Sequence, residues 1–230
     1  MCAGLTEVRE QFELPTASGR HGHMATPNDG WVEGTEAIAR DLKVRHPRLS
    51  HKGVTRLWSM TSDLVLYFGT TVADPNGGML AVAVKYAEEL KRPRVLELLT
   101  LEREFWRRQG VPWLLITPDL YHPLSQGVLG AGLAYVVGQE RVPAEHIALC
   151  RELQPIFGGL RMQRICEELQ RRIGTTTTGA LSVFWGSVWS GALTLDIGQA
   201  WRSDQRVRFV SASEFLFQNP IASRRSSWCD

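Results

Sequence analysis

Hydrophobic residues in the first half of the chain gather in short runs that polar turns separate. The runs Val54–Met60 and Leu64–Phe68 are rich in β-branched and aromatic residues, and they flank the polar triplet Thr61–Asp63. The turn-forming stretch Asp74–Gly78 follows, and after it comes the almost wholly apolar run Met79–Tyr86. Apolar runs that are joined by such a turn are typical of a β-hairpin. We therefore expect strands in all three runs, with the last two paired as a hairpin.

A helical spacing of apolar positions follows this hairpin. Pro93 suits the first turn of a helix, the apolar face extends from Val95 to Trp106, and Gly110 ends the pattern. The run Pro112–Thr117 then returns as a short buried strand. The order strand, strand, helix, strand predicts a mixed sheet with helical cover, which is an α/β core.

The segment ahead of these strands carries weaker patterns. Leu5–Leu14 indicates an extended piece, Thr16–Glu33 indicates a surface loop, and helix propensity rises from Thr35 until His46-Pro47 ends it. The loop contains His21-Gly22-His23, but no third metal ligand stands at a useful spacing. An exposed polar loop is therefore the better interpretation of these histidines.

The pattern changes after Pro123 to helical periods with short connections. The expected helices are Leu124–Val137, Ala144–Phe157, Arg161–Ile173 and Thr177–Ser190. Leu193–Ile197 and Val207–Val210 indicate strands on either side of a polar loop. Helices followed by a β-hairpin are the plan of a winged helix. We therefore expect an α/β domain over residues 1–122 and a mainly α winged-helix domain over residues 123–230.

The composition of the chain excludes several classes of protein. The formal net charge of +2 comes from 26 basic and 24 acidic residues, so any contact with nucleic acid must come from local patches. The 4 cysteines lie far apart, which argues against a zinc finger or a disulfide framework and favours reduced thiols in a cytoplasm. The most apolar stretch, Gly179–Ile197, contains Asp196 and several serines, so we expect no membrane span and no membrane partner.

Asp63 and Lys85 are the charged residues that suggest chemistry. Each stands beside an apolar run, where a charged group is costly unless it is paired or bound to a metal. If the two runs pair, the two side chains can meet at one edge of the sheet. Metal-dependent phosphodiester hydrolysis uses such an arrangement, in which a carboxylate holds Mg²⁺ and a cation orients water or stabilises negative charge. An ordinary ion pair at a strand end explains the same spacing.

Other charged residues have plain explanations. Glu97, Glu102 and Glu104 share a predicted helix with several arginines, so a solvated face with local ion pairs is the expected arrangement. A second basic group consists of Arg161, Arg164, Arg171 and Arg172. It could contact DNA phosphates, contact an acidic partner or only solubilise the chain.

The order and spacing of several short stretches resemble the TnsA family, the endonuclease subunits of heteromeric, Tn-seven-type transposases. These stretches run collinearly over most of the first 120 residues. They are Val8–Phe12, Thr35–Pro47, Met60–Asp63, Ala81–Leu90, Arg94–Trp106 and Pro112–Thr117. The second half resembles the family's C-terminal winged helix, chiefly through Ala180–Asp196.

The resemblance implies a restriction-endonuclease fold for the first domain and assigns roles to four residues. The family's acidic metal ligand falls on Asp63, the lysine of its strand motif on Lys85, and a further glutamate on the following helix on Glu97. The main-chain carbonyl of Val84 would complete a site for Mg²⁺, with Mn²⁺ as a substitute.

Two features of the chain depart from the family pattern. Ala83 stands where the family has a polar or acidic residue two positions before the lysine. The family also carries a glutamate on a helix upstream of the stretch that falls here on Val8–Phe12, and we expect that helix to be missing. A wrongly assigned start, a truncated remnant or a split polypeptide would each explain that difference.

The resemblance implies a prokaryotic, cytoplasmic, Mg²⁺-dependent endonuclease subunit that cuts one DNA strand at transposon ends. Its expected partners are transposon-end DNA, a TnsB-like transposase that cuts and joins the other strand, and a TnsC-like AAA+ ATPase regulator. The two departures support a second hypothesis, in which the chain has lost the site and acts as a DNA-binding or assembly module. An unrelated restriction-type nuclease that acts alone is a third hypothesis.

Overall fold

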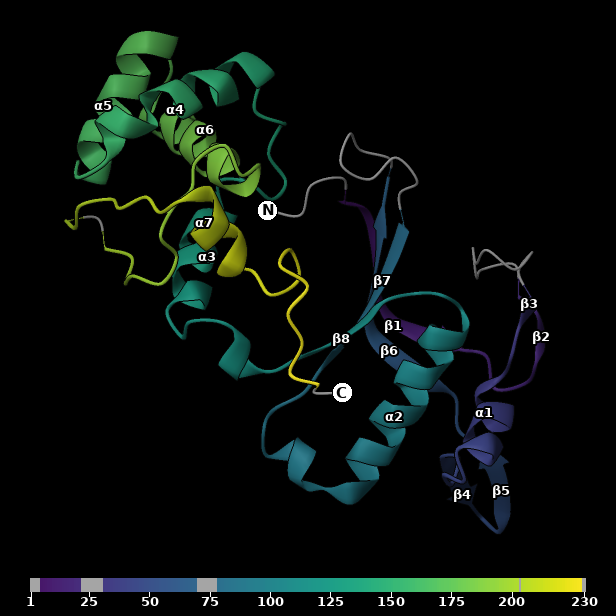
Figure 1. The fold of residues 1–230 in the computed structure, drawn as a ribbon. Coiled ribbons are helices and arrows are strands. Elements are labelled where there is room, and N and C mark those ends of the chain that lie inside the picture. Colours follow the sequence, from purple (N-terminus) through teal and green to yellow (C-terminus); the bar gives the residue numbers. More distant parts are fainter. Residues whose placement is uncertain (1–4, 22–30, 70–77, 203, 229–230) are drawn as a thin grey trace. The chain divides into compact units, whose positions relative to one another are not determined.

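The computed structural model describes residues 5–21, 31–69, 78–202 and 204–228 (Figure 1). Its contacts divide these residues into two compact units, the first formed by 5–118 with 225–228 and the second by 119–224. The expected turn at 74–77 and residues 22–30 of the expected surface loop, including His23, lie outside the described residues. The mixed α/β character that the sequence predicts for the first unit is confirmed.

The first unit is built on a four-stranded sheet. Its strands are β1 (Leu5–Leu14), β6 (Met60–Phe68), β7 (Gly78–Val84) and β8 (Trp113–Ile116), in the order β1-β6-β7-β8. The first three strands are antiparallel, and β7 pairs with β8 in parallel. A parallel pair needs a crossover, which is provided here by helix α2 (Pro93–Arg108).

Helix α2 packs its apolar stripe against this sheet. Leu101, Phe105 and Trp106 are fully buried and join Val65 of β6 and Ala81 of β7 in one core cluster. The helix begins at Pro93, and Gly110 follows its end with a φ of 69°, a conformation that glycine adopts without strain. The expected helix is therefore present with its expected ends.

The remaining short elements of the described residues surround this core. They are β2 (Gly19–Arg20), β3 (Trp31–Val32), α1 (Thr35–Asp41), β4 (Arg48–His51), β5 (Val54–Leu57) and the 3-10 turns Glu89–Lys91 and Pro118–Leu120. The C-terminal segment belongs to the same unit, because the Ser227 N–H donates to the Leu115 carbonyl of β8 at 2.8 Å. The Trp228 ring also packs edge-on against Trp113. The tail therefore satisfies a strand edge that would otherwise be open.

The run Val54–Met60 is not one strand, as the sequence analysis expected. Its first part, β5, pairs with β4 in a separate hairpin, and a new strand begins at Met60. The reversal occurs at Lys52 and Gly53, which both have positive φ angles, 47° and 78°. Two consecutive residues with positive φ form the tight turn that matches the twist of a hairpin, so this Lys-Gly pair ends one strand and starts the next.

The second unit consists mainly of helices. They are α3 (Ser125–Leu133), α4 (Ala144–Phe157), α5 (Met162–Ile173), α6 (Thr177–Trp189) and α7 (Ala212–Phe217). The four expected helices are present, although α3 ends earlier than expected. Helix α7 was not predicted from the sequence, although its start carries a complete capping box between Ser211 and Glu214. The two described cysteines, Cys150 and Cys166, are buried free thiols in this unit.

The strands expected at Leu193–Ile197 and Val207–Val210 are reduced to a short antiparallel contact. The Val210 N–H donates to the Thr194 carbonyl and the Asp196 N–H to the Arg208 carbonyl, each at 2.9 Å. The ladder stops there because other groups take its hydrogen bonds. The Gln154 side-chain oxygen accepts a hydrogen bond from the Thr194 N–H at 3.1 Å, and the Thr194 hydroxyl donates one to the Val210 carbonyl at 2.6 Å. The expectation of two regular strands was therefore wrong.

Long apolar helices are absent from the part of the chain that the structure describes: none has both the length and the apolar character to cross a membrane. Helix α6 is the most apolar, and its side chains are used inside the second unit. Phe184 and Trp185 are buried there with Phe157 of α4 and Ile165 of α5. Helix α6 is therefore the centre of the second core.

Replacing Gly132 of α3 by alanine is expected to destabilise the second unit. The added Cβ would overlap the indole ring of Trp185, which is buried in the core. We expect the free energy of unfolding to fall by about 1–3 kcal/mol, as is usual for overpacking. Urea unfolding followed by tryptophan fluorescence measures it.

Gly130 of the same helix is the matched control, because a Cβ at that position meets nothing within 4 Å. Gly130→Ala should be neutral or should stabilise the protein by up to about 1 kcal/mol, since alanine favours a helix. Equal effects of the two substitutions would contradict the close approach of Gly132 to Trp185.

Candidate functional site

The strands β6 and β7 separate at the point where the charged residues stand. Their pairing ends at Leu64 and Val82, and β7 continues its parallel pairing with β8. Beyond that end the main-chain N–H of Val84 donates to Asp63 Oδ2 at 2.7 Å. The Asp63 carboxylate therefore satisfies a backbone group that has lost its strand partner, and it lies in the fork between the two strands.

The ammonium group of Lys85 binds two oxygen atoms in this fork. Its Nζ donates to Asp63 Oδ2 at 2.8 Å and to the main-chain carbonyl of Val84 at 2.9 Å. The Lys85 and Asp63 side chains are 24% and 25% exposed, so solvent reaches the pair without surrounding it. The structure thus brings Asp63, Val84 and Lys85 together, and two oxygens converge on one cation.

Glu97 stands apart from this cluster. It lies on α2 with its side chain 48% exposed, and it forms an ion pair with Arg94 at 2.7 Å. Among the described residues, no hydrogen bond or ion pair joins Glu97 to Asp63 or Lys85. Its supporting role therefore stays a prediction, for which the geometry offers no contact.

Glu102 is the acidic residue of α2 that departs from the expected solvated face. It is only 5% exposed, so the interpretation of Glu102 as part of a solvated face was wrong. The Ser62 hydroxyl donates to its Oε1 at 2.7 Å, and the Trp113 indole N–H donates to the same atom at 3.2 Å. The Trp106 indole N–H in turn donates to Ser62 Oγ at 2.7 Å. The hydrogen-bonded chain of Trp106, Ser62, Glu102 and Trp113 therefore lies directly behind Asp63.

A signal for the burial of Glu102 was present in the sequence. The residue lies three positions after Leu99 and three before Phe105, which places it on the apolar stripe of α2. Glu104 fits the expected arrangement better, because it pairs with Arg107 and Arg108 at 2.6 and 2.8 Å. The helical period thus separates the buried Glu102 from Glu104, which is partly exposed and paired with two arginines.

Burial raises the pKa of Glu102 to about 7, because the surrounding protein disfavours the charged form. The hydrogen bonds from Ser62 and Trp113 act in the opposite direction. The negative charge of Asp63 adds to the increase, and the positive charge of Lys85 reduces it. The buried carboxyl group is thus electrostatically coupled to both residues of the fork.

Ala83 does not provide a ligand in the fork. It is fully buried and packs with Leu99 and Leu115. No group of three or more histidine, cysteine, aspartate or glutamate side chains that could hold a metal is found among the described residues. The oxygen donors that the fork offers are the Asp63 carboxylate and the Val84 carbonyl, and hard cations such as Mg²⁺ prefer oxygen donors and keep several waters.

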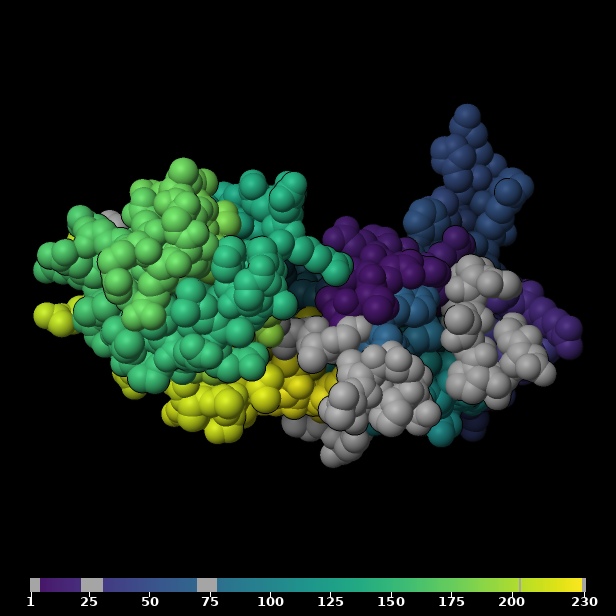
Figure 2. Space-filling view, turned by 90° about the horizontal axis from the view of Figure 1, so that it is seen from above, coloured from purple at the N-terminus to yellow at the C-terminus, as the bar shows by residue number. Residues whose placement is uncertain are grey.

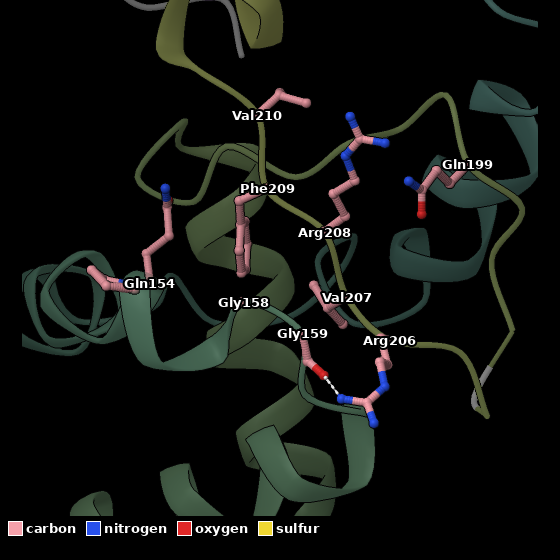
Figure 3. A pocket seen from close by; sticks show the side chains of 10 residues that line it. Gln154, Gly158, Gly159, Gln199, Arg206, Val207, Arg208, Phe209 and Val210 are labelled. Carbon is pink, nitrogen blue, oxygen red and sulfur yellow. Dashed lines mark hydrogen bonds between the residues drawn. The ribbon is translucent and has the colours of Figure 1, made fainter.

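The second unit has a surface groove of about 580 Å³ with a different lining (Figure 3). It lies between the end of α4 and the segment 206–210, and it is lined by Gln154, Gly158, Gly159, Arg206, Arg208 and Phe209, among others. The Arg206 guanidinium donates to the Gly159 carbonyl at 2.9 Å. The lining residues include no carboxylate, imidazole or thiol, so this groove suits binding rather than acid–base chemistry.

The pH dependence of stability tests the buried state of Glu102. The unfolded chain releases this proton near pH 4.5, whereas the folded protein retains it to about pH 7. The free energy of unfolding should therefore fall as pH rises through this interval, with about 3 kcal/mol contributed by Glu102. Glu102→Gln should lack this part of the decrease in urea unfolding at a series of pH values.

Glu97→Gln is the matched control, because an exposed ion pair contributes at most about 1 kcal/mol. Its stability profile should follow that of the wild type between pH 4.5 and 8. A Glu102→Gln profile parallel to the wild-type profile would show that Glu102 titrates as a solvated group.

Comparisons with known proteins agree with the resemblance in the sequence. Residues 6–118 match a protein family described as "TnsA-like endonuclease N terminal". The transposon Tn7 transposition protein TnsA of Escherichia coli is 25% identical over 206 residues, which are 88% of this chain and 66% of that protein. The chain therefore spans about two thirds of the length of this curated relative. The chain belongs to the TnsA family, and its residues 6–118 form the TnsA-like N-terminal endonuclease domain.

Proposed function

We propose that this chain is a metal-dependent DNA endonuclease subunit of a heteromeric transposase and that it cleaves one strand at each transposon end. The observation that supports this proposal is the fork in the TnsA-like domain, where the Lys85 ammonium lies 2.8 Å from Asp63 Oδ2 and 2.9 Å from the Val84 carbonyl. Membership in the TnsA family supports an endonuclease that acts in transposition.

The fork offers the groups that phosphodiester hydrolysis requires. The Asp63 carboxylate and the Val84 carbonyl would hold Mg²⁺, or Mn²⁺ in its place, because both oxygens already turn toward one ammonium group. When bound, the metal ion would supply Lewis acidity toward the scissile phosphate. Lys85 would orient the attacking water or stabilise the negative charge that develops on the phosphate.

The present partners of Lys85 suggest how it becomes available to DNA. Its ammonium is held by the same two oxygens that a metal ion would use. A cation at that position would compete with Lys85 for both oxygens, and a DNA phosphate would then be the natural counter-ion for the lysine. The ion pair with Asp63 would therefore hold the Lys85 side chain in the fork, next to the position of the scissile phosphate.

The second unit supports a division of work between subunits. We propose that this unit is a winged helix. Its elements follow the plan of that fold in the order α4, the single bridge residue Arg161, α5, α6 and two antiparallel segments. Helix α6 would be the recognition helix, yet it carries no lysine, arginine, asparagine or glutamine that could read base edges. Sequence-specific recognition of the ends would therefore belong to a TnsB-like transposase.

The chain would also depend on partners for energy. It has no Gly-Lys-Ser/Thr motif for binding nucleotide phosphates. A TnsC-like AAA+ ATPase would therefore regulate the complex, and the second unit would be its docking region. The described residues that line the groove between Gly158 and Arg208 include two arginines and no acidic residue, which suits an acidic partner segment.

A non-catalytic assembly module is the second candidate function. Ala83 favours it, because a buried alanine packed on Leu99 and Leu115 leaves the fork with a single carboxylate. Asp63 also has a structural task, since it satisfies the Val84 N–H where the strands separate. In this alternative the Asp63–Lys85 pair would hold the fork together, and the chain would bind DNA and its partners without cutting.

Substitution of the fork residues distinguishes the two functions. Asp63→Asn retains an oxygen that can accept from the Val84 N–H but removes the negative charge, and Lys85→Ala removes the cation. Each should reduce strand cleavage on the order of 100-fold or more, the usual effect of losing one electrostatic group in an active site. The measurement is strand-specific cleavage of cognate transposon-end DNA with Mg²⁺ or Mn²⁺ and both partner proteins.

Asp119→Asn and Lys91→Ala are matched controls, because both residues are exposed and neither lies in the fork. They should cleave as the wild type does. If Asp63→Asn and Lys85→Ala also cleave normally, the fork is not the active site. A wild type that binds DNA and partners but does not cleave would support the assembly module.

A further inference from the structure

The segment between Asp41 and Asp63 has an unbalanced charge. It contains no carboxylate, and its cations are Lys43, Arg45, Arg48, Lys52 and Arg56. This concentration contrasts with the near-neutral chain as a whole, whose formal net charge is +2. The segment is therefore a local basic patch of the kind that a near-neutral protein needs in order to bind nucleic acid.

The cations of this segment form no ion pair with any other described residue. Among the described residues, the arginines of α2 and α5 are mostly paired with glutamates one helical turn away, as Arg107 is with Glu104 and Arg171 with Glu168. No ion pair within the described ranges involves any of the five cations between Asp41 and Asp63. Their charge is therefore available to an external anion.

The β4–β5 hairpin carries three of these cations away from the body of the first unit. Figure 2 shows it in dark blue, standing out from the surrounding surface. Every residue from Arg48 to Arg56 is exposed, and the Ser50 and Thr55 hydroxyls bind each other at 2.8 Å across the strands. The Trp58 N–H donates to the Pro47 carbonyl at 2.9 Å and closes the base of the hairpin.

The register of the hairpin distributes its charge over both faces. Arg48 lies opposite Leu57 and Leu49 lies opposite Arg56, so the two arginines project from opposite faces. Lys52 lies in the turn at the tip. A ribbon with cations on both faces and at its end suits a space with negative charge on both sides rather than a flat acidic surface. The major groove of B-DNA is such a space, and it admits a two-stranded β-ribbon.

Exposed apolar side chains argue against a merely solubilising role. Leu49, Val54 and Trp58 are 50%, 55% and 55% exposed on this hairpin and its base. Apolar side chains that stay in water add no burial to the stability of the hairpin, and apolar groups gathered on one projecting element are typical of an interaction site. Contact with the sugars that line a groove would cover them.

The hairpin lies within reach of the DNA that the fork would hold. Asp63 lies six positions after Leu57, the last residue of β5, so their Cα atoms are at most roughly 22 Å apart. One turn of duplex is about 34 Å long. A single duplex can therefore contact the hairpin and the fork at the same time.

We propose that the β4–β5 hairpin is a DNA-binding arm, which enters a groove of the duplex and neutralises phosphates beside the strand that the fork would cut. This inference rests on the proposed function, which makes DNA the substrate. The contact is with the phosphate backbone and is independent of sequence. The arm therefore holds the duplex, while the partner transposase selects the ends.

The salt dependence of DNA binding tests the arm. The probe is a fluorescein-labelled random-sequence duplex of 30 base pairs, and anisotropy is measured with the full chain in EDTA between 50 and 200 mM KCl. Arg48→Ala, Lys52→Ala and Arg56→Ala are combined in one variant. The slope of log K against log[salt] is negative, and its magnitude should decrease in this variant by about 2 to 3, roughly 0.9 for each lost phosphate contact. Arg56→Ala alone should lower it by about 1.

Two control variants separate the arm from general charge. Arg48→Lys, Lys52→Arg and Arg56→Lys together preserve every charge on the hairpin and should keep the wild-type slope. Lys91→Ala, Arg107→Ala and Arg171→Ala remove the same net charge from cations that are already paired, and they should also keep that slope. A wild-type slope and affinity in the neutralised hairpin variant would overturn the proposal. So would a loss of partner-protein binding with DNA binding unchanged, because the arm would then be a protein-docking element.

The same assays distinguish failure of the arm from failure of the proposed function. In the Asp63→Asn background, the three hairpin substitutions should still reduce the magnitude of the salt slope by about 2 to 3, because the fork is not part of the arm. If Asp63→Asn still cleaves while the neutralised hairpin loses DNA affinity, the arm stands and the assignment of the active site fails. If cleavage depends on Asp63 while the hairpin variant binds DNA normally, the proposed function stands and the arm is rejected.

Discussion

The buried hydrogen-bonded chain behind the fork is the interaction on which the geometry of the first unit depends. It joins three elements, because Trp106 and Glu102 belong to α2, Ser62 to β6 and Trp113 to β8. Each link is made in a region where an unpaired polar group would cost about 1–3 kcal/mol. These hydrogen bonds therefore fix α2 against the sheet at the level of Asp63, and the neighbouring fork receives a defined position.

The sequence was sufficient to predict the meeting of Asp63 and Lys85, because strand pairing and a period of two residues constrain charged residues strongly. The same reasoning failed for Glu102, since its charge was weighed above its place on the apolar stripe of α2. The β4–β5 hairpin was missed because Lys52-Gly53 is a weak turn signal within an apparently continuous run. The expected strand at Leu193–Ile197 failed for a different reason: the side chain of Gln154 comes from α4, and no local pattern records that contact.

The distribution of cations separates structural charge from charge that is free to bind. Arg108 bridges Glu33, Asp41 and Glu104, and it thereby connects α2 to α1 and to the segment before it. Arg171 and Arg172 share Glu168 on the surface of α5. Such pairs leave little field at a distance, whereas hairpin cations that form no ion pair within the described ranges attract an anion strongly at low salt.

The direction of the hydrogen bonds behind the fork decides which oxygen of Glu102 can carry a proton. An indole N–H can only donate, so the Ser62 oxygen must accept from Trp106, and its single hydrogen is committed to Glu102 Oε1. Trp113 donates to that same oxygen. Oε1 is thus an acceptor twice over, and a protonated Glu102 must hold its hydrogen on Oε2. The two tryptophans and the serine therefore make this carboxyl group asymmetric: they assign one oxygen to the framework and leave the other to exchange protons.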